Sequence, residues 1–319
     1  MSTPIPAADV LAGFDAGQTH TRCRLARSTG ELIGEGEGSG VSHLGSAAGP
    51  QRFASALRSS LEAAYENAGL SSSETATSLL AAAVGASGIE AGSPSQRLGL
   101  QIARDTLACE HVLVCGDERT ALAGAFAPRQ AGIVLISGTG SIAIGRDSSG
   151  REHRCGGWGW LVDGGGSAMD IGHDGLALSL RMADGRLPET GLKQALWQTL
   201  NVEHSHELKA LVVDPHFGAA GFARLAPVVS AQAAAGDGPA QQVIAHAGRQ
   251  LAELVAGVAS QLQLTAPPIC CSGGAIGHLE PLQVQLKQQL TLLLPQAQLV
   301  GARGDACSGA LALAQALSS

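Results

Sequence analysis

Two stretches decide the fold of this chain: VLAGFDAGQT at residues 10–19 and GIVLISGTGS at residues 132–141. Each begins with an apolar run of strand length and ends in a turn of glycines and small polar residues. In both places a second strand follows, at residues 21–26 and 142–145, and leads to a turn that contains serine and glycine. A strand–turn–strand unit that recurs after about 120 residues predicts a duplicated architecture with two facing domains.

The rest of the chain alternates apolar runs of strand length with amphipathic helical patterns, which is typical of an α/β protein. A third strand is expected at residues 31–34, followed by a glycine-rich loop at residues 35–45. Further strands are predicted at residues 79–84, 111–115, 268–271 and 298–300. Helices are predicted at residues 51–68, 95–109, 118–126, 167–182, 192–200, 222–234, 239–264 and 280–290.

The domain boundary has to lie in a short connection, because no linker rich in proline and serine interrupts the chain. We expect an N-terminal domain of residues 1–118 and a C-terminal domain of residues 119–319, with a hinge within residues 117–131. The last helix, residues 306–318, is expected to pack back on the N-terminal domain.

The composition is that of a globular protein rich in turns. Of the 319 residues, 43 are glycine, nine are aromatic (five Phe, three Trp and one Tyr) and 45% are apolar. Glycine at roughly twice its usual share of about 7% also occurs in fibrous and low-complexity chains, but this chain has no G-X-Y period and is rich in apolar residues. The glycines are therefore expected at turns and at close backbone approaches.

Charge and cysteine content exclude several classes of protein. A net charge of −7 and a pI near 5.8 argue against a nucleic-acid partner, which needs clustered basic residues. The sequence contains neither a signal peptide nor an apolar run long enough to span a membrane, so we expect a cytoplasmic protein. The seven cysteines form no CxxC pair and no zinc-type spacing, which predicts free, buried thiols.

Three turns after predicted strands combine glycine with serine or threonine, at residues 15–21, 137–141 and 272–277. Glycine lets backbone N–H groups approach phosphate oxygens, and the hydroxyl groups add further donors. Open α/β sheets bind their ligands at the carboxyl ends of strands, where these turns lie. The chain has no GxxxxGK[ST] pattern and no GxGxxG that opens a helix, which excludes a P-loop or a Rossmann nucleotide site.

Two aspartates follow buried strands at positions where a carboxylate can reach a ligand. Asp15 belongs to the first glycine turn, and Asp117 comes directly after the strand at residues 111–115 and before a predicted helix. A carboxylate at the carboxyl end of a strand suits magnesium binding or proton abstraction. The residues alone leave two alternatives open, since Asp117 could be a helix N-cap and Asp15 an ordinary turn residue.

Together these segments resemble the superfamily of acetate and sugar kinases, heat-shock ATPases and actin. Residues 15–21, DAGQTHT, resemble its first phosphate motif, residues 135–141, LISGTGS, its second, and residues 272–274, SGG, its adenosine motif. CGGWG at residues 155–159 and GSA at residues 166–168 are similar to the BadF/BadG/BcrA/BcrD-type ATPase and N-acetylglucosamine kinase family. The resemblance implies a two-domain duplicated ribonuclease-H-like (actin-like ATPase) fold with a nucleotide cleft between the domains, and ATP and Mg²⁺ as cofactors.

The resemblance also implies a role for each matching residue. Asp117 matches the general base that acts on the sugar hydroxyl, and Asp15 matches the acid that holds the metal, magnesium. The implied ATP- and phosphate-binding residues are Asp15, Gly17, Thr19, Thr21, Gly138, Thr139, Gly140, Ser141, Gly273 and Gly274. The implied sugar-binding residues are Ser42, His43, Gly157, Trp158, Gly159 and Asp163.

The sugar-binding segment departs from the family pattern. The family continues from Gly-Gly-Trp-Gly to Gly-Asp-Glu-Gly-Ser, whereas here Gly164 and Gly165 replace the Asp-Glu pair and Asp163 lies one position early. Ser42 and His43 stand where the family has a sugar-binding asparagine. The implied activity is phosphorylation of N-acetylglucosamine, and the altered pocket leaves glucosamine or another amino sugar open, because losing one buried hydrogen-bonding group changes substrate preference strongly.

Two other functions within the resemblance stay open. Some members are ATPase activators with an iron–sulfur cluster, which needs closely spaced cysteines on exposed turns. Here Cys270 and Cys271 fall in a predicted buried strand and Cys155 stands alone. The third alternative is a nucleotide-binding sensor without transfer activity, against which Asp117 counts. We expect a small-molecule sugar as the partner, no nucleic acid or membrane, and a homodimer by analogy.

Overall fold

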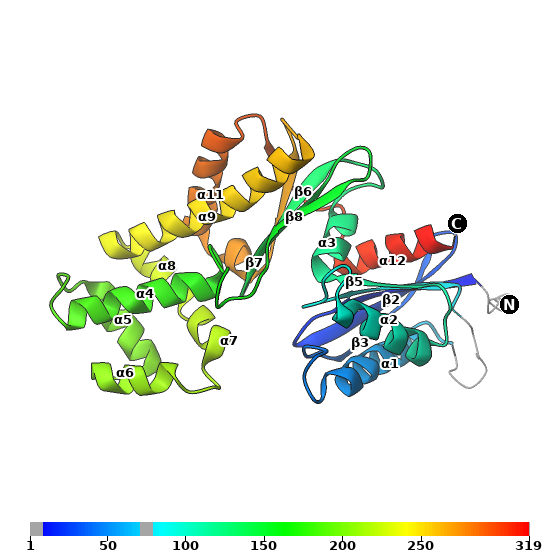
Figure 1. Cartoon of the computed structure of the whole chain (residues 1–319), viewed down its shortest axis with the longest axis horizontal. Helices are drawn as coiled ribbons and strands as arrows, with labels where there is room; N and C mark the ends of the chain where they lie inside the picture. The colour runs from blue at the N-terminus through cyan, green and yellow to red at the C-terminus, as the bar shows by residue number, and fades with distance from the viewer. Residues whose placement is uncertain (1–8, 71–78, 319) are drawn as a thin grey trace. The chain divides into compact units, whose positions relative to one another are not determined.

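The computed structural model describes residues 9–70 and 79–318. The chain divides into two compact units, of which unit 1 runs to Gln130 and resumes at Ala302, while unit 2 comprises Ala131–Gly301. Each unit is built on one five-stranded mixed sheet covered by helices (Figure 1). The predicted two-domain α/β fold is therefore confirmed.

Unit 1 is a sheet with helices on both faces. Its elements are β1 (Val10–Ala16), β2 (His20–Arg27), β3 (Leu32–Ser39), α1 (Gly49–Asn67), β4 (Ala81–Ala86), α2 (Pro94–Leu107), β5 (Val112–Gly116), α3 (Asp117–Ala125) and α12 (Ala306–Leu317). The strand order is β3-β2-β1-β4-β5, with β1 antiparallel to β2 and parallel to β4. Helices α1 and α2 pack together on one face, and α3 and α12 pack together on the other.

Unit 2 repeats this sheet and adds more helices. Its elements are β6 (Gly132–Ser137), β7 (Ser141–Arg146), β8 (Glu152–Gly156), α4 (Ala168–Ala183), α5 (Gly191–Leu200), α6 (Ser205–Val212), α7 (Gly218–Ala223), α8 (Ala226–Ala234), α9 (Gly238–Leu262), β9 (Pro268–Ser272), α10 (Gly274–His278), α11 (Glu280–Leu293) and β10 (Gln298–Val300). The order β10-β9-β6-β7-β8 places β6 where β1 lies in unit 1, antiparallel to the next strand and parallel to a later one. The predicted duplication is therefore present in both sheets.

Unit 1 extends beyond residue 118 to Gln130, which lies within the range given for the hinge, and it includes the C-terminal helix. The reason is the close contact of α3 with α12, where a Cβ on Gly309 would overlap the backbone of Thr120 and Gly124. Gly13 of β1 likewise leaves the space that α12 fills, because a Cβ there would meet the backbone of Leu311. Small residues at these crossings let α12 lie directly on α3 and β1.

Two strand ends in unit 1 differ from the predictions. β1 continues to Ala16, so Asp15 lies inside the strand, opposite Arg22 and Gly85, instead of in the turn that follows. β3 continues to Ser39, into the predicted loop. Its alternate glycines Gly34, Gly36 and Gly38 face α1, and a Cβ on any of them would overlap the backbone of that helix. The helix occupies the space that side chains would otherwise take.

Several elements of unit 2 also differ from the predictions. The predicted helix at residues 222–234 is two helices, α7 and α8, and Pro227 lies in the first turn of α8. Proline has no N–H group and clashes with the preceding turn, so it begins a helix but cannot continue one. Three short elements, β8, α6 and α10, were not predicted.

All seven cysteines are free, as predicted. Five are buried, and Cys155 and Cys271 are half-buried. Within residues 9–70 and 79–318, no helix is long and apolar enough to cross a membrane.

Candidate active site

The two candidate acids lie at the carboxyl edge of the unit 1 sheet. Asp15 is the last residue but one of β1, and Asp117 is the first residue of α3, directly after β5. β4 lies between these strands, and its Gly85 pairs with Asp15 on one side and with Cys115 on the other. The carboxylates are close enough for the charge of Asp117 to raise the pKa of Asp15. The fold thus brings together two acids that are far apart in the sequence.

Asp117 is positioned by the start of α3. Gly116 is the N-cap of α3, so Asp117 is not the N-cap residue that the sequence left as an alternative. The backbone oxygen of Asp117 accepts a hydrogen bond from Thr120 Oγ1 at 2.9 Å. Thr120 is completely buried against Gly85, where a Cβ would overlap its hydroxyl and methyl groups. The absent side chain of Gly85 therefore lets α3 begin directly on the sheet.

Burial makes both carboxyl groups weaker acids than usual. Loss of hydration raises the pKa of Asp117, and hydrogen bonding to the backbone N–H of Glu118 lowers it in part. Burial is also the main cause that raises the pKa of Asp15, followed by the negative charge of Asp117, while Arg22 opposes both effects. A raised pKa makes a carboxylate a better proton acceptor near neutral pH, which suits a general base.

The other phosphate-binding candidates of unit 1 lie around the turn between β1 and β2. The N–H of Gly17 donates to the carbonyl oxygen of His20 at 3.0 Å, which closes the turn. Thr19 is exposed, and its Oγ1 lies 3.0 Å from Nδ1 of His20. Thr21 is completely buried, and among the described residues its Oγ1 has no hydrogen-bond partner. Thr19 is thus accessible to a ligand, whereas the Thr21 hydroxyl lies beneath the surface.

Two glycine turns of unit 2 lie side by side. β6 and β9 are parallel neighbours, so the turns after them begin at the same edge of the sheet. Gly273 has a φ of 104° and lies so close to the backbone of Ser137 that a Cβ has no room. Open space lies beside Gly140, since a Cβ there would meet no described atom within 4 Å. Residues 138–141 and Gly273–Gly274 therefore form one glycine surface with room for a ligand, as phosphate and adenosine binding requires.

The loop at residues 157–167 is fastened to this glycine surface. Ser141 Oγ donates to the Gly165 carbonyl (2.7 Å), and two hydrogen bonds beside it come from Ser137 Oγ at the end of β6 to the Gly166 carbonyl (2.9 Å) and from the Ala168 N–H at the start of α4 to the Gly138 carbonyl (2.8 Å). Both serines are buried. The loop and the turn at residues 138–141 are thus held in a fixed arrangement within unit 2.

The sugar-binding candidates of unit 2 lie in the exposed part of this loop. Gly157 and Gly159 have φ angles of 77° and 99°, a conformation that favours glycine. The side chain of Trp158 between them is 61% exposed, and the guanidinium of Arg154 lies 4.5 Å from the centre of its ring. The carboxylate of Asp163 forms no hydrogen bond or ion pair with any described residue.

Gly164 and Gly165 replace the expected Asp-Glu pair, and other side chains occupy the space beside them. A Cβ on Gly164 would lie 2.6 Å from Cε of Met169, and a Cβ on Gly165 would lie 2.7 Å from Nε2 of Gln250. Both neighbours line a cavity next to the loop. Because Gly164 and Gly165 have no side chains, Met169 from α4 and Gln250 from α9 can occupy the space beside them.

The remaining sugar-binding candidates, Ser42 and His43, lie in unit 1 between β3 and α1. Within the described part of the chain, Ser42 Oγ is buried without a hydrogen-bond partner. His43 is exposed, and its Nδ1 accepts the N–H of Gly45 at 3.1 Å. The predicted sugar-binding residues are thus divided between the two units.

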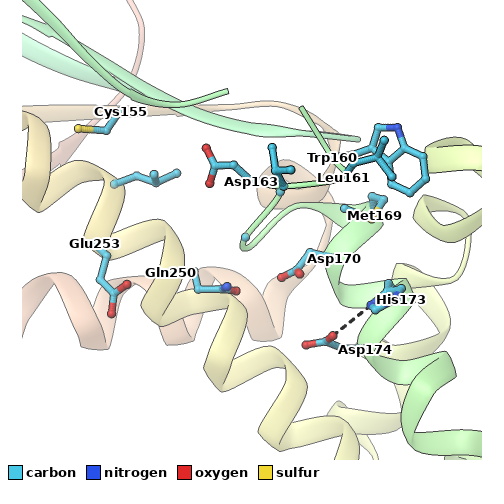
Figure 2. A pocket seen from close by; sticks show the side chains of 14 residues that line it. Cys155, Trp160, Leu161, Asp163, Met169, Asp170, His173, Asp174, Gln250 and Glu253 are labelled. Atoms are coloured by element: carbon cyan, nitrogen blue, oxygen red, sulfur yellow. Dashed lines mark hydrogen bonds and ion pairs between the residues drawn. The ribbon is translucent and has the colours of Figure 1, made fainter. Parts of the chain in front are cut away.

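The cavity beside the loop has a volume of about 610 Å³ and contains polar residues that the sequence analysis missed (Figure 2). Asp170, His173 and Asp174 line it from α4, and Gln250 and Glu253 line it from α9. Nδ1 of His173 lies 3.3 Å from Oδ1 of Asp174. Asp170, His173 and Asp174 are three and four residues apart, so they lie on one face of α4, directly after the GSA motif. This spacing is a signal in the sequence that could have identified them.

The residues present fit ATP and Mg²⁺. The open space beside Gly140 can admit a phosphate group, and Asp15 and Asp117 are carboxylates of the kind that hold Mg²⁺ together with phosphate oxygens. Among the residues that the structure describes, no group of three or more His, Cys, Asp or Glu side chains is arranged to hold a metal ion.

A duplicated α/β unit with glycine turns and carboxylates at the carboxyl edges of its sheets is the architecture of the actin-like ATPases and sugar kinases. Residues 12–309 match the model of the BadF/BadG/BcrA/BcrD ATPase family. The chain belongs to this family, as its motifs indicate.

Individual relatives are similar over part or all of the chain. An N-acetylmuramic acid/N-acetylglucosamine kinase from Clostridium acetobutylicum is 29% identical over 206 residues, 64% of this chain and 67% of the relative. An N-acetyl-D-glucosamine kinase from Dictyostelium discoideum is 32% identical over 187 residues, 57% of this chain and 59% of the relative. The matches thus span about three fifths to two thirds of these curated relatives. The solved structure of a candidate N-acetylglucosamine kinase from Chromobacterium violaceum has a TM-score of 0.79 and 27% identity, covering 98% of this chain and 100% of that one.

Proposed function

We propose that the protein is an ATP-dependent amino-sugar kinase, which transfers the γ-phosphoryl group of ATP to a hydroxyl group of the sugar. The observation that carries this proposal is the pair of partly buried carboxylates, Asp15 and Asp117, at the carboxyl edge of the unit 1 sheet. Both curated relatives are named as N-acetylglucosamine kinases, so N-acetylglucosamine is the reference acceptor. The cytoplasmic location and the homodimer stay predictions.

In this proposal Asp117 is the general base. Its carboxylate accepts the proton of the acceptor hydroxyl while that oxygen bonds to the γ-phosphorus, and the bond from the γ-phosphorus to the bridging oxygen breaks to release ADP. Such a transfer depends mainly on in-line positioning and charge stabilisation, so the base has to be held firmly. The contact of Thr120 with Gly85 supplies this support for Asp117.

The phosphates would contact the glycine turn at residues 138–141. Its backbone N–H groups and the exposed Thr139 can donate to phosphate oxygens, and Gly273 and Gly274 lie beside them. Ser141 Oγ already donates to Gly165, so we assign that side chain to supporting the loop. Mg²⁺ bound with ATP would neutralise phosphate charge, and Asp15 is the residue that would hold it.

One alternative has an observation from the sequence in its favour. The replacement of the family's Asp-Glu pair by Gly164 and Gly165 fits a nucleotide-binding sensor that does not transfer phosphate. An iron–sulfur activator is disfavoured, because none of the seven cysteines is exposed, and Cys270, Cys271 and Cys155 lie inside strands instead of on exposed turns.

The test is a coupled ADP-release assay with N-acetylglucosamine, glucosamine, N-acetylmannosamine, N-acetylmuramic acid and glucose. We expect at least one amino sugar to raise ADP release well above the rate with ATP alone. Asp117→Asn should lower kcat by about 10²–10⁴-fold, because an amide cannot accept the proton, and should leave ATP affinity within about twofold. Asp105→Asn, at an exposed position on α2, is the matched control. If no sugar raises ADP release, or if Asp117→Asn retains substantial transfer, the kinase proposal or its base assignment is wrong.

A further inference from the structure

We propose that the cavity beside the loop binds the protonated amino group of the acceptor, so that the enzyme prefers a free amino sugar to its N-acetylated form and rejects a sugar that carries a carboxylate. We call this cavity the acidic pocket and define it by Asp163, Asp170, Asp174, Gln250 and Glu253. The inference rests on the proposed kinase function and specifies its acceptor.

Charge is the first argument. Carboxylates from three elements face the acidic pocket: Asp163 from the loop, Asp170 and Asp174 from α4, and Glu253 from α9 (Figure 2). Of the described residues that line it, none is lysine or arginine, and the basic side chain present is His173. A concave site lined by charge of one sign concentrates ligands of the opposite sign. The acidic pocket is therefore electrostatically suited to a cation.

Two of the four carboxylates, those of Asp163 and Glu253, have no paired cation among the described residues of unit 2. His173 pairs with Asp174 at 3.3 Å, and Asp170 accepts the N–H of Gly166 at 2.9 Å, while His246 and His173 lie close enough to lower the pKa of Asp170 in part. The carboxylates of Asp163 and Glu253 form no hydrogen bond or ion pair with any residue that the structure describes. An ammonium group would supply the missing charge and several donors, whereas an added carboxylate would be repelled.

Gln250 gives an argument that does not depend on charge. Its Oε1 is a buried acceptor without a hydrogen-bond partner among the described residues, and Gln250 lines the acidic pocket. An ammonium group has three N–H donors for the acceptor oxygens of the side chains that line the acidic pocket, whereas an N-acetyl amide has one N–H and adds a carbonyl oxygen of its own.

Aromatic rings at the edge of the acidic pocket fit the same ligand. Trp160 lines the pocket, and its ring centre lies 6.3 Å from that of Phe222. Phe222 in turn contacts His173 and Phe217, with ring centres 5.3 Å and 4.9 Å apart. An aromatic face attracts a nearby cation and offers an apolar surface to the C–H groups of a sugar ring.

The acidic pocket is also linked to the predicted phosphate turn. Gly164 and Gly165 form part of its wall, and the Gly165 carbonyl accepts the buried hydroxyl of Ser141 at 2.7 Å. A ligand held in the pocket is therefore fixed relative to residues 138–141. This arrangement can select an acceptor by charge and also orient it for transfer.

The experiment compares three acceptors that differ in charge at pH 7: glucosamine, N-acetylglucosamine and N-acetylmuramic acid. We expect kcat/KM for glucosamine to exceed that for N-acetylglucosamine by about tenfold at low ionic strength, and no transfer to N-acetylmuramic acid. The preference should shrink in roughly 0.5 M salt, because mobile ions screen the carboxylates. Equal or better use of N-acetylglucosamine, or transfer to N-acetylmuramic acid, would overturn the proposal.

Variants identify the residues responsible. Asp163→Asn should raise KM for glucosamine about ten times more than it raises KM for N-acetylglucosamine, because only the cationic acceptor uses the charge. Asp184→Asn is the matched control, since Asp184 is exposed at the end of α4, where it pairs with Arg186 at 2.7 Å, outside the pocket. An equal loss for both acceptors would mean that Asp163 has a structural role only and would contradict the proposal.

A direct binding measurement separates this inference from the kinase function. Isothermal titration of the wild-type protein without ATP should show glucosamine binding more tightly than N-acetylglucosamine, and Asp163→Asn should remove the difference. Such binding without ADP release in the coupled assay would support the acidic pocket and reject the kinase proposal. Absence of the difference would reject the acidic pocket even if the protein phosphorylates amino sugars.

Discussion

At the scale of single residues, Asp15 and Asp117 carry a cost in stability that is linked to their proposed function. Burial raises the pKa of both carboxyl groups, and the charge of Asp117 raises the pKa of Asp15 further. The folded state thus disfavours the ionised forms that metal binding and proton abstraction need. A group with a raised pKa stabilises the fold below its unfolded-state pKa, and this contribution is lost as the pH rises through the folded-state pKa.

Replacing either acid by its neutral amide should therefore stabilise the free protein at neutral pH. We expect Asp15→Asn and Asp117→Asn each to raise the free energy of unfolding by about 1 kcal/mol at pH 7, a typical size for one substitution. The gain should shrink as the pH falls towards 4, where the wild-type carboxyl groups become protonated. Urea unfolding at several pH values measures it, with Asp105→Asn as the control. A loss of stability at pH 7, or a gain that grows towards acid, contradicts this account.

The sequence reveals these two acids but not the acidic pocket. Asp15 and Asp117 could be predicted because each comes at the end of a buried apolar strand, beside glycine. Asp170 and His173 look like ordinary polar residues of an amphipathic helix. Their environment depends on Gln250, which α9 brings to the same cavity from far along the chain. The spacing of Asp170, His173 and Asp174 places them on one helix face, but no local pattern indicates that Gln250 lies opposite them.

At the scale of elements, the contact between β4 and α3 determines where Asp117 lies. Gly85→Ala would push Thr120 away and displace the first turn of α3. We expect a loss of about 1–3 kcal/mol in the free energy of unfolding, as for other overpacked sites. The kcat of the proposed transfer should fall about tenfold with ATP affinity nearly unchanged. Urea unfolding and the coupled assay measure these effects.

Two variants test this explanation of Gly85. Adding Thr120→Ala removes the hydroxyl and methyl groups that collide, so the double variant should recover part of the lost stability and activity. Gly238→Ala is the control, because its Cβ would point into open space at the start of α9. Strictly additive losses in the double variant would mean that Gly85 acts through something other than Thr120.

Periodic elements were predicted well, and elements built on glycine were not. The bounds of β10 agree with the prediction and those of α12 differ from it by one residue, because their patterns are interrupted clearly at both ends. β3 was predicted too short, since Gly34, Gly36 and Gly38 resemble a loop in the sequence but face α1 in the structure. Only the position of α1 distinguishes a glycine-rich loop from a strand whose glycines face a helix.

At the scale of the whole molecule, the duplication is visible in the sequence because the strand–turn–strand pattern occurs twice. Unit 1 ends at Gln130, within residues 117–131 where the hinge was predicted, but its exact end differs from residue 118 because α3 packs on a helix from the other end of the chain. Gly124 and Gly309 permit that contact, and a glycine by itself does not indicate its partner. Long-range packing therefore determines which segments belong to each unit, whereas the local strand–turn–strand pattern determines the repeated sheet.

Nucleotide binding should stabilise the molecule in a way that depends on the glycine turn of unit 2. A nonhydrolysable ATP analogue with Mg²⁺, at about 100 times its Kd, should add roughly 2.7 kcal/mol to the free energy of unfolding. Gly140→Ala should fold normally, because its Cβ would meet no described atom within 4 Å, but it would occupy the space proposed for phosphate. We therefore expect an unchanged Tm of the free variant and a much smaller shift with the nucleotide.

Thermal unfolding with and without the analogue measures both quantities, and Gly301→Ala, where a Cβ also meets open space, is the control. If Gly140→Ala keeps the full nucleotide shift, the phosphates do not bind at residues 138–141. If its Tm falls without nucleotide, the space beside Gly140 is needed for folding instead of ligand binding. The combination of an unchanged free protein and a lost ligand shift is expected only when the glycine is there for the ligand, because neither packing nor backbone strain requires it in the free chain.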